Sequence, residues 1–137
     1  MEYFKWTNEL STHIEEIDTQ HKEFISLVNK LYEAIKRESE KEILGEIISG
    51  LVEYAIIHFT TEERLLKNYG YNDLANHKRE HGEFKKHILE LNNRYITDHS
   101  VSAMPLVQFV KDWFTKHIKM TDMKYVLFLK GKDLSLF

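Results

Sequence analysis

Apolar residues recur at helical spacing along four long stretches of this chain, and few residues that interrupt helices separate them. The first stretch is typical, because Phe24, Ile25, Val28 and Leu31 follow the three- and four-residue steps of one helix face. Only five Gly and one Pro occur in 137 residues, whereas β proteins rich in turns use many of both. The pattern therefore predicts an all-α protein.

The stretches define four expected helices and the segments around them. We expect an N-terminal arm over residues 1–17 and helices at about 19–37, 42–68, 72–95 and 104–118. Short connections between helices of this length favour a single domain over residues 1–137, an up-down-up-down four-helix bundle with a short C-terminal segment. Asp18 is expected to cap the first helix, Gly70 to end the second, and Pro105 to lie in the first turn of the fourth.

Charge and composition exclude several classes of function. The formal net charge is −3 with both signs interspersed, so no basic surface for nucleic acid or for a membrane is expected. No cysteine is present, which excludes disulfides, zinc-thiolate sites and iron–sulfur clusters. The N-terminus lacks the apolar stretch of a signal peptide, and a cytoplasmic protein is expected. We expect a monomer, because one core uses up the apolar residues.

Five of the eight histidines fall on the apolar faces of the predicted helices. His117, for example, follows Val110 by seven residues and Phe114 by three. The five are His21, His58, His77, His81 and His117. Glu62 follows His58 by four residues and shares its face. Histidines and a carboxylate therefore point into the bundle from all four helices.

Asp122 is out of phase with the other inward-pointing residues. It lies five residues beyond His117, and an unbroken α-helix would turn it away by roughly 140°. If Asp122 reaches the same interior, the fourth helix must end or distort between Ile118 and Asp122.

A metal centre explains the buried polar groups better than a purely structural role. A lone histidine on an apolar face is usually a hydrogen-bonded core residue, but burying this many polar groups without partners costs roughly 1–3 kcal/mol each. Seven side chains exceed the four ligands of a zinc site and suit two six-coordinate ions, with imidazole and carboxylate suiting iron. Glu62 and Asp122 would then lie between the ions. His13, His87 and His99 are expected at the surface.

Taken together, these motifs resemble the hemerythrin family, and most closely its single-domain bacteriohemerythrins. The resemblance covers Trp6 to Tyr125 and rests on four motifs: His21, His58-Phe-Thr-Thr-Glu62, His77-Lys-Arg-Glu-His81 and His117-Ile-Lys-Met-Thr-Asp122. It implies that His77, His81 and His117 hold one iron, and that His21 and His58 hold the other and leave it an open position. It also implies that Glu62 and Asp122 bridge the irons beside an oxo or hydroxo group, and that dioxygen binds reversibly.

Reversible binding requires a dry pocket around the open position. The expected wall consists of apolar neighbours of the ligands: Phe24, Ile25, Phe59, Trp113, Phe114 and Ile118. Trp113 and Phe114 are expected also to limit access. His13 departs from the family, since related sequences usually have glycine there, and this leaves the path of the arm open.

Other functions remain open from the sequence. A di-iron oxidase or peroxidase is one, but ferritin-like sites use more carboxylates and a Glu-x-x-His pair, which this sequence lacks, so we do not expect an enzyme. An oxygen or redox sensor acting through a partner is another, and iron handling is a third. An oxygen-using enzyme is a candidate partner for delivery.

Overall fold

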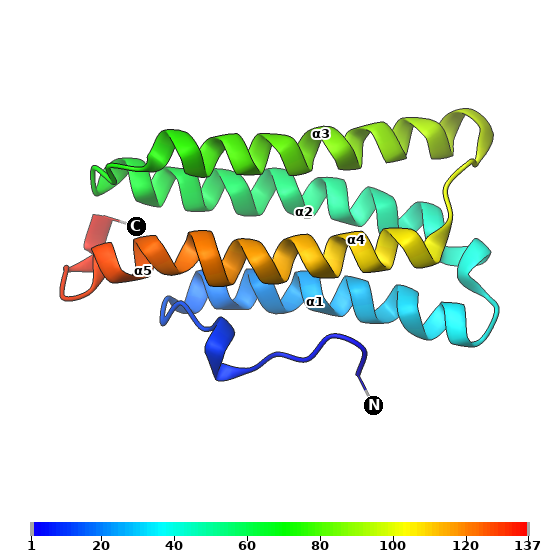
Figure 1. The fold of residues 1–137 in the computed structure, drawn as a ribbon, viewed down its shortest axis with the longest axis horizontal. Coiled ribbons are helices and arrows are strands. Elements are labelled where there is room, and N and C mark those ends of the chain that lie inside the picture. Colours follow the sequence, from blue (N-terminus) through cyan, green and yellow to red (C-terminus); the bar gives the residue numbers. More distant parts are fainter. Residues whose placement is uncertain (1, 137) are drawn as a thin grey trace.

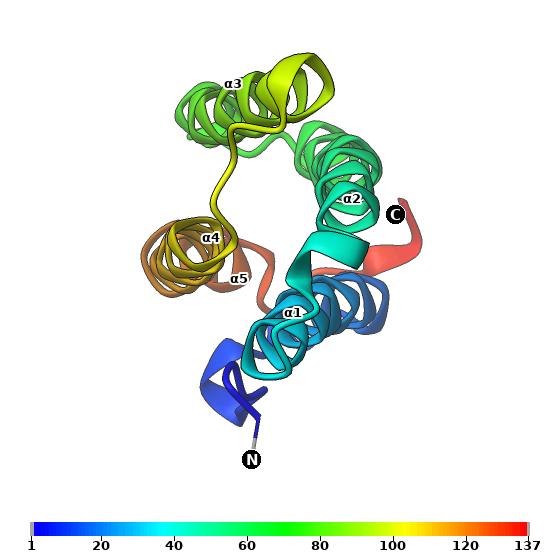
Figure 2. The ribbon, with the colours of Figure 1, turned by 90° about the vertical axis from the view of Figure 1, so that its right-hand side faces the viewer.

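The computed structural model describes residues 2–136 as a bundle of four long helices, without strands in that range (Figure 1). The long helices are α1 (Glu15–Lys36), α2 (Glu40–Asn68), α3 (Leu74–Asp98) and α4 (Ala103–Lys116). A π-helical turn (His117–Asp122) joins α4 to α5 (Met123–Leu129), and 3-10 turns lie at Asn8–Leu10 and Leu134–Leu136. Seen end-on, α1 to α4 surround one interior (Figure 2). The predicted all-α four-helix bundle is confirmed.

The first helix begins earlier than predicted, and Asp18 is not its N-cap. The residue preceding the helix is Ile14, which has an extended backbone and no side-chain cap. The carboxylate of Asp18 instead accepts hydrogen bonds from the Ser11 hydroxyl at 2.7 Å and from the Thr12 amide and hydroxyl at 2.8 Å. The prediction that Asp18 caps the helix is therefore wrong, and Asp18 instead fastens the arm to the first turn of a helix that has already begun.

The fourth helix continues well beyond its predicted end at residue 118. Through the π-helical turn it runs on into α5 and reaches Leu129, because Tyr125 and Leu129 are apolar residues that become buried on the same side. The two other residues predicted at helix ends lie where expected. Gly70 has φ +65° just after α2, and Pro105 lies in the first turn of α4.

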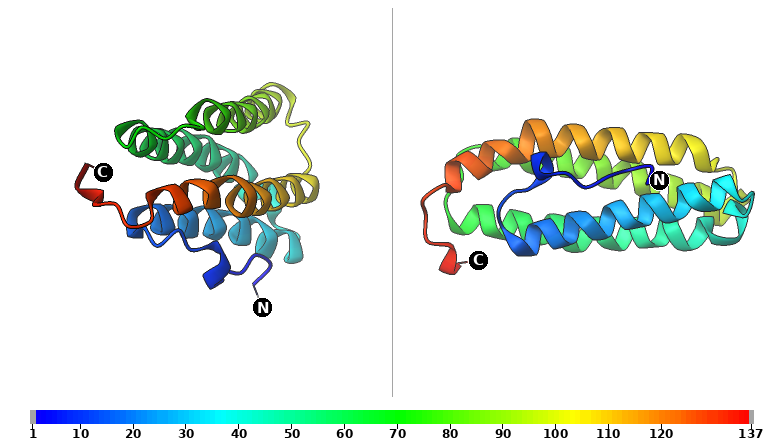
Figure 3. Two further views of the ribbon diagram at one scale, coloured as in Figure 1. Left: turned by 60° about the vertical axis from the view of Figure 1, so that its left-hand side comes forward. Right: turned by 90° about the horizontal axis from the view of Figure 1, so that it is seen from below.

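The arm packs along the bundle beside α1 and α4 (Figure 3). The backbone of Phe4 exchanges two hydrogen bonds with the Asn29 side chain of α1, at 2.8 and 2.9 Å. Lys111 of α4 donates to the carbonyl of Tyr3 at 3.1 Å. Phe4 and Leu10 are buried in the main core. The arm therefore covers the edge between the first and last long helices.

α2 is long and apolar enough, by length and composition alone, to cross a membrane. In the structure, however, it is a core helix that buries Leu51, Leu65 and Leu66 within the bundle. The same helix also buries the polar residues His58 and Glu62.

Candidate metal centre

The seven side chains expected to bind metal come together in one half of the bundle. They lie near the start of α1 and α3, in the later part of α2 and at the end of α4, so they occupy the half nearer the α2–α3 connection (Figure 1). None is more than 4% exposed. The set is His21, His58, Glu62, His77, His81, His117 and Asp122.

One oxygen of each carboxylate faces a group of three imidazoles and lies close to two of them. The Nε2 atoms of His77 and His81 lie 2.7 and 2.9 Å from Oε1 of Glu62. The Nε2 atom of His117 lies 3.2 Å from that of His81 and 3.1 Å from Oδ1 of Asp122. Glu62 and these three histidines are close enough for their ligand atoms to hold one ion.

Two imidazoles face the remaining oxygens of the same carboxylates. The Nε2 atoms of His21 and His58 are 3.1 Å apart. Oε2 of Glu62 lies 3.7 Å from Nε2 of His58, and Oδ2 of Asp122 lies 3.5 Å from Nε2 of His21. Each carboxylate therefore turns one oxygen to the three-histidine group and the other to the two-histidine group, which is the arrangement of a bridging ligand.

The π-helical turn brings Asp122 into this cluster. A π-helix bonds residue i to i+5 and so places residues five apart on one face, where an α-helix would separate them. The turn spans His117 to Asp122, the two residues whose phase conflicted in the sequence. The helix distorts at the predicted place, and such π-helical turns are frequent at functional sites.

The donor set fits a pair of metal ions. Oδ2 of Asp122 is buried without a hydrogen-bond partner among the described residues, and Oδ1 has only the imidazoles of His77 and His117 nearby, at 3.2 and 3.1 Å. Leaving charged groups in this state is costly, so a cation is the partner that the geometry lacks. Five imidazole nitrogens and two carboxylates suit iron better than a hard, oxygen-seeking ion such as magnesium.

Protons can balance the carboxylates when metal is absent. Burial disfavours a charged imidazole, and it lowers the pKa of His58 to about 3. For His77 and His117 the nearby Asp122 and Glu62 carboxylates outweigh burial and raise the pKa to about 10 and about 9. Two protonated imidazoles then offset the negative charge of the two carboxylates.

Three outer residues orient the imidazoles, and helical periodicity predicted no role for any of them. Each lies close to the Nδ1 atom of a ligand histidine whose Nε2 atom faces the cluster. The pairs are Gln20 with His58 at 2.6 Å, Glu63 with His81 at 2.7 Å, and Glu80 with His117 at 2.9 Å. Such partners fix the ring orientation and the tautomer of a metal ligand.

Tyr125 is a fourth residue that the sequence did not single out. It is fully buried, and its hydroxyl donates a hydrogen bond of 2.7 Å to Oε2 of Glu62. Glu62 is thereby also held by a residue of another helix, since Tyr125 belongs to α5.

The six apolar residues expected around the centre lie on different sides of it. Phe114 packs edge-on against His21, with ring centroids 5.1 Å apart, and stacks on Phe24 at 4.0 Å. Phe59 stacks on His81 at 3.8 Å, and Trp113 on His117 at 4.5 Å, so these two border the three-histidine group. Ile25 and Ile118 are buried in the same core.

Tyr54 borders the two-histidine group, and the sequence gave no reason to single it out from other core residues. Its ring stacks on that of His58, with centroids 5.2 Å apart. The three histidines left outside the cluster, His13, His87 and His99, are exposed as expected. His13 has φ +61°, a left-handed conformation that favours glycine.

Comparison with known proteins agrees with this geometry. The family described as Hemerythrin HHE cation binding domain matches residues 12–129. A bacteriohemerythrin of Clostridium acetobutylicum is 34% identical over 127 residues, which cover 90% of this chain and 98% of that protein. A bacteriohemerythrin of Methylococcus capsulatus is 31% identical, covering 91% and 95% of the two chains.

A more distant relative and a solved structure extend the likeness. A myohemerythrin of Theromyzon tessulatum is 29% identical and covers 96% of this chain and 94% of its own. A crystal structure of wild-type hemerythrin superposes with a TM-score of 0.85 at 30% identity, covering 94% of this chain and 99% of that one. The fold and most of the length of the chain are therefore shared with these proteins.

Proposed function

This chain belongs to the hemerythrin family, and from that premise we propose that it stores or delivers dioxygen by binding it reversibly at a di-iron centre. The observation that carries the proposal is the division of the two carboxylates, each with one oxygen toward three imidazoles and the other toward two. Two ferrous ions held by these residues would supply the two electrons that reversible binding of dioxygen requires.

We assign the ligands by the two groups of imidazoles. His77, His81 and His117 would hold one iron, His21 and His58 the other, and Glu62 and Asp122 would bridge them, with an oxo or hydroxo group completing the bridge. The two-histidine group offers one side chain fewer, so an iron held there would keep a position open to dioxygen. Histidine-rich ligation of this kind carries little negative charge and stabilises highly oxidised iron poorly, which supports reversible binding over oxygen activation.

The side chains around the two-histidine group keep water from this position. Phe114 packs edge-on against His21 and stacks on Phe24. The ring of Phe24 also contacts that of Tyr54, with centroids 4.9 Å apart. An apolar wall of this kind excludes the water and acid that would convert the centre irreversibly to its ferric state. Phe114 is therefore the residue that we expect to limit access most directly, whereas Trp113 borders the other iron.

The relatives are hemerythrins, which are oxygen-binding proteins rather than enzymes, and a catalytic role is not proposed. We propose that residues 1–137 act as a single domain, as a monomer in the cytoplasm, and that an oxygen-using enzyme receives the dioxygen.

Air-free loading with ferrous iron, followed by admission of oxygen, tests the proposal. We expect a charge-transfer colour that appears with oxygen and disappears under vacuum, at two irons per chain. His58→Ala should abolish binding of the iron pair, whereas His87→Ala, which alters an exposed histidine, should leave it intact. Permanent oxidation without release of oxygen would contradict reversible binding.

A further inference from the structure

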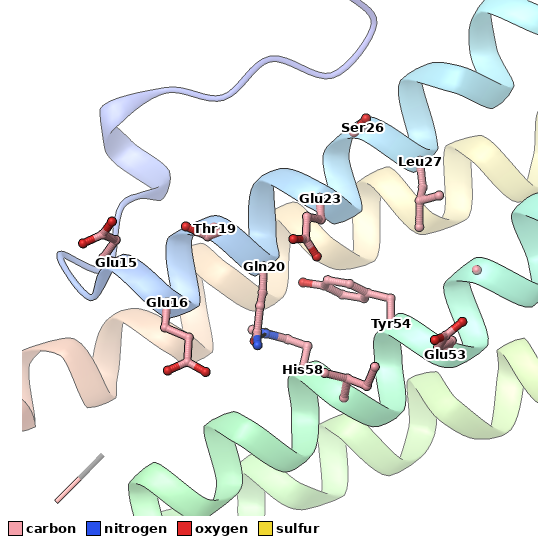
Figure 4. A pocket seen from close by; sticks show the side chains of 12 residues that line it. Glu15, Glu16, Thr19, Gln20, Glu23, Ser26, Leu27, Glu53, Tyr54 and His58 are labelled. Atoms are coloured by element: carbon pink, nitrogen blue, oxygen red, sulfur yellow. Dashed lines mark hydrogen bonds between the residues drawn. The ribbon is translucent and has the colours of Figure 1, made fainter.

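A cleft opens between α1 and α2 on the side of the two-histidine group (Figure 4). Its volume is about 870 Å³, and its walls consist of residues from these two helices. Four of the lining side chains are carboxylates, and the lining contains no Lys or Arg. The four are Glu15, Glu16, Glu23 and Glu53. A concave surface lined by one sign of charge concentrates ions of the opposite sign.

The cleft ends at one of the proposed iron ligands. His58 is the one member of the seven ligand residues that lines it. The Nδ1 atom of His58 is hydrogen-bonded to Gln20 on the cleft side at 2.6 Å, while its Nε2 atom lies 3.1 Å from that of His21 inside the centre. A single imidazole ring therefore separates the cleft from the metal centre.

Tyr54 adds an unsatisfied polar group to the cleft wall. Its side chain is only 8% exposed, and its hydroxyl has no hydrogen-bond partner among the described residues. The ring lies between α1 and α2 with its hydroxyl directed toward Glu23 (Figure 4). A buried hydroxyl without a hydrogen-bond partner lowers the stability of the fold, so a ligand that binds to it transiently would remove this cost.

We propose that this acidic cleft is the route by which a hydrated divalent cation, ferrous iron in the loaded protein, reaches the metal centre through His58. The inference rests on the proposed di-iron function. The carboxylates gather the cation at the surface, the Tyr54 hydroxyl offers an oxygen in place of a lost water, and the His58 ring turns from Gln20 to pass the ion inward.

The spacing of the carboxylates fits passage better than retention. Among the described residues, the groups whose ligand atoms are close enough to hold an ion all belong to the centre itself. The cleft carboxylates are spread along its sides, so they attract a hydrated ion by charge without enclosing it. Dioxygen is neutral and gains nothing from such a lining.

The test compares metal uptake by two double variants with equal changes of charge. Glu23→Gln/Glu53→Gln alters exposed carboxylates of the cleft, and Glu42→Gln/Glu90→Gln removes two exposed carboxylates elsewhere. Metal-free protein is mixed with Fe²⁺ without air, and bound iron is followed in time. We expect the cleft variant to load about 3- to 10-fold more slowly at low salt, and the difference to shrink at high salt.

Release from the loaded protein gives a second measurement that does not depend on the metal-free form. Because exit follows the same path, iron transfer to a neutral ferrous chelator should slow in the cleft variant by a similar factor. Tyr54→Phe keeps the ring on His58 and removes the oxygen, so it should slow uptake at low and high salt alike. The rate of dioxygen binding should be unchanged in the Glu23→Gln/Glu53→Gln variant.

The outcomes separate this inference from the proposed function. Slower uptake that still reaches two irons per chain supports the route. Equal rates in the cleft and control variants, with two irons bound in both, overturn the route and leave the di-iron centre in place. A third ion that stays bound and is lost in Glu23→Gln/Glu53→Gln overturns passage in favour of a resident cation. Failure of the unaltered protein to bind two irons overturns both.

Discussion

The Nε2 atom of His117 and the Oδ1 atom of Asp122 lie 3.1 Å apart, although the two residues are five positions apart in the helix. The π-helical turn between them makes this contact possible, because its wider repeat returns the fifth residue to the same face. One local distortion of a single helix thus supplies the second carboxylate of the centre.

Replacing this carboxylate tests its bridging role. In Asp122→Ala both groups of imidazoles lose an anionic neighbour, so we expect the protein to keep less than half of its two irons when it is passed over a desalting column. Asp112→Ala removes an exposed carboxylate from the preceding helix and should retain both irons. Iron is measured by chelation after denaturation. Two irons in Asp122→Ala would show that Glu62 alone can bridge the pair.

The outer carboxylates should tune the affinity of the three-histidine iron. Glu80 accepts hydrogen bonds from His117 at 2.9 Å and from the Thr121 hydroxyl at 2.7 Å. Glu80→Gln removes the negative charge behind the imidazole, and we expect affinity for that iron to fall about 10- to 100-fold. Chelator competition measures the change. Glu83→Gln, which alters an exposed partner of Arg79, provides the control and should leave affinity unchanged.

Iron loading should release protons. Because the neighbouring carboxylates outweigh burial and raise the pKa of His77 to about 10 and of His117 to about 9, both imidazoles carry protons at pH 7 in metal-free protein. Iron must displace these protons, so we expect loading to release about two protons per chain at pH 7 and fewer as the pH approaches 10. A pH indicator in weak buffer counts them. Release of none would contradict the assignment.

The same pKa values predict how the stability of the metal-free protein depends on pH. A raised pKa contributes stability that is complete below the ordinary value of 6.5 and disappears as pH rises through 9 to 10. The urea midpoint of metal-free protein should therefore fall between pH 7 and pH 10. In the loaded protein the metal replaces these protons, and the midpoint should vary less over that range.

Tyr125 should stabilise the fold through its contact with Glu62. In Tyr125→Phe a buried carboxylate oxygen loses a donor at 2.7 Å, so we expect the metal-free protein to lose about 1–3 kcal/mol in the free energy of unfolding. Urea denaturation measures the loss. Tyr32→Phe, in which a partly buried ring packed on Tyr3 loses its hydroxyl, should cost less. Equal losses would mean that the contact with Glu62 contributes nothing specific.

His13 should be replaceable with a gain in stability. Its φ of +61° is unfavourable for any residue with a Cβ atom, and its side chain is exposed. His13→Gly should therefore raise the free energy of unfolding by about 1 kcal/mol. His13→Ala keeps the strained backbone and should give no such gain. A loss of stability in His13→Gly would indicate that the imidazole makes a contact of its own.

Helical periodicity was enough to predict the bundle and the inward direction of five histidines and Glu62, because a ligand that points into the core must share a face with core residues. The phase of Asp122 identified where the helix had to distort. The form of the distortion could not be predicted, since a π-helical turn and a helix end leave the same break in the pattern.

The residues that escaped prediction contact the centre across helices. Gln20, Glu63 and Glu80 sit beside ligands in the sequence but point toward imidazoles of neighbouring helices. Their partners depend on how the helices are rotated against one another, which periodicity within one helix does not record. Tyr125 escaped for a related reason, because it follows the π-helical turn and the phase of α5 was unknown.

All seven proposed ligands occupy the half of the bundle next to the α2–α3 connection, so the metal centre and the purely apolar packing lie in different halves along the long axis. In the opposite half, where α1 ends and α2 begins, the described residues that are buried are apolar, such as Leu31, Leu44 and Ile47, and serve packing alone. Substitutions there can change the stability of the bundle without altering the residues of the metal centre. We therefore expect substitutions in one half to alter stability, and substitutions in the other to alter the metal centre.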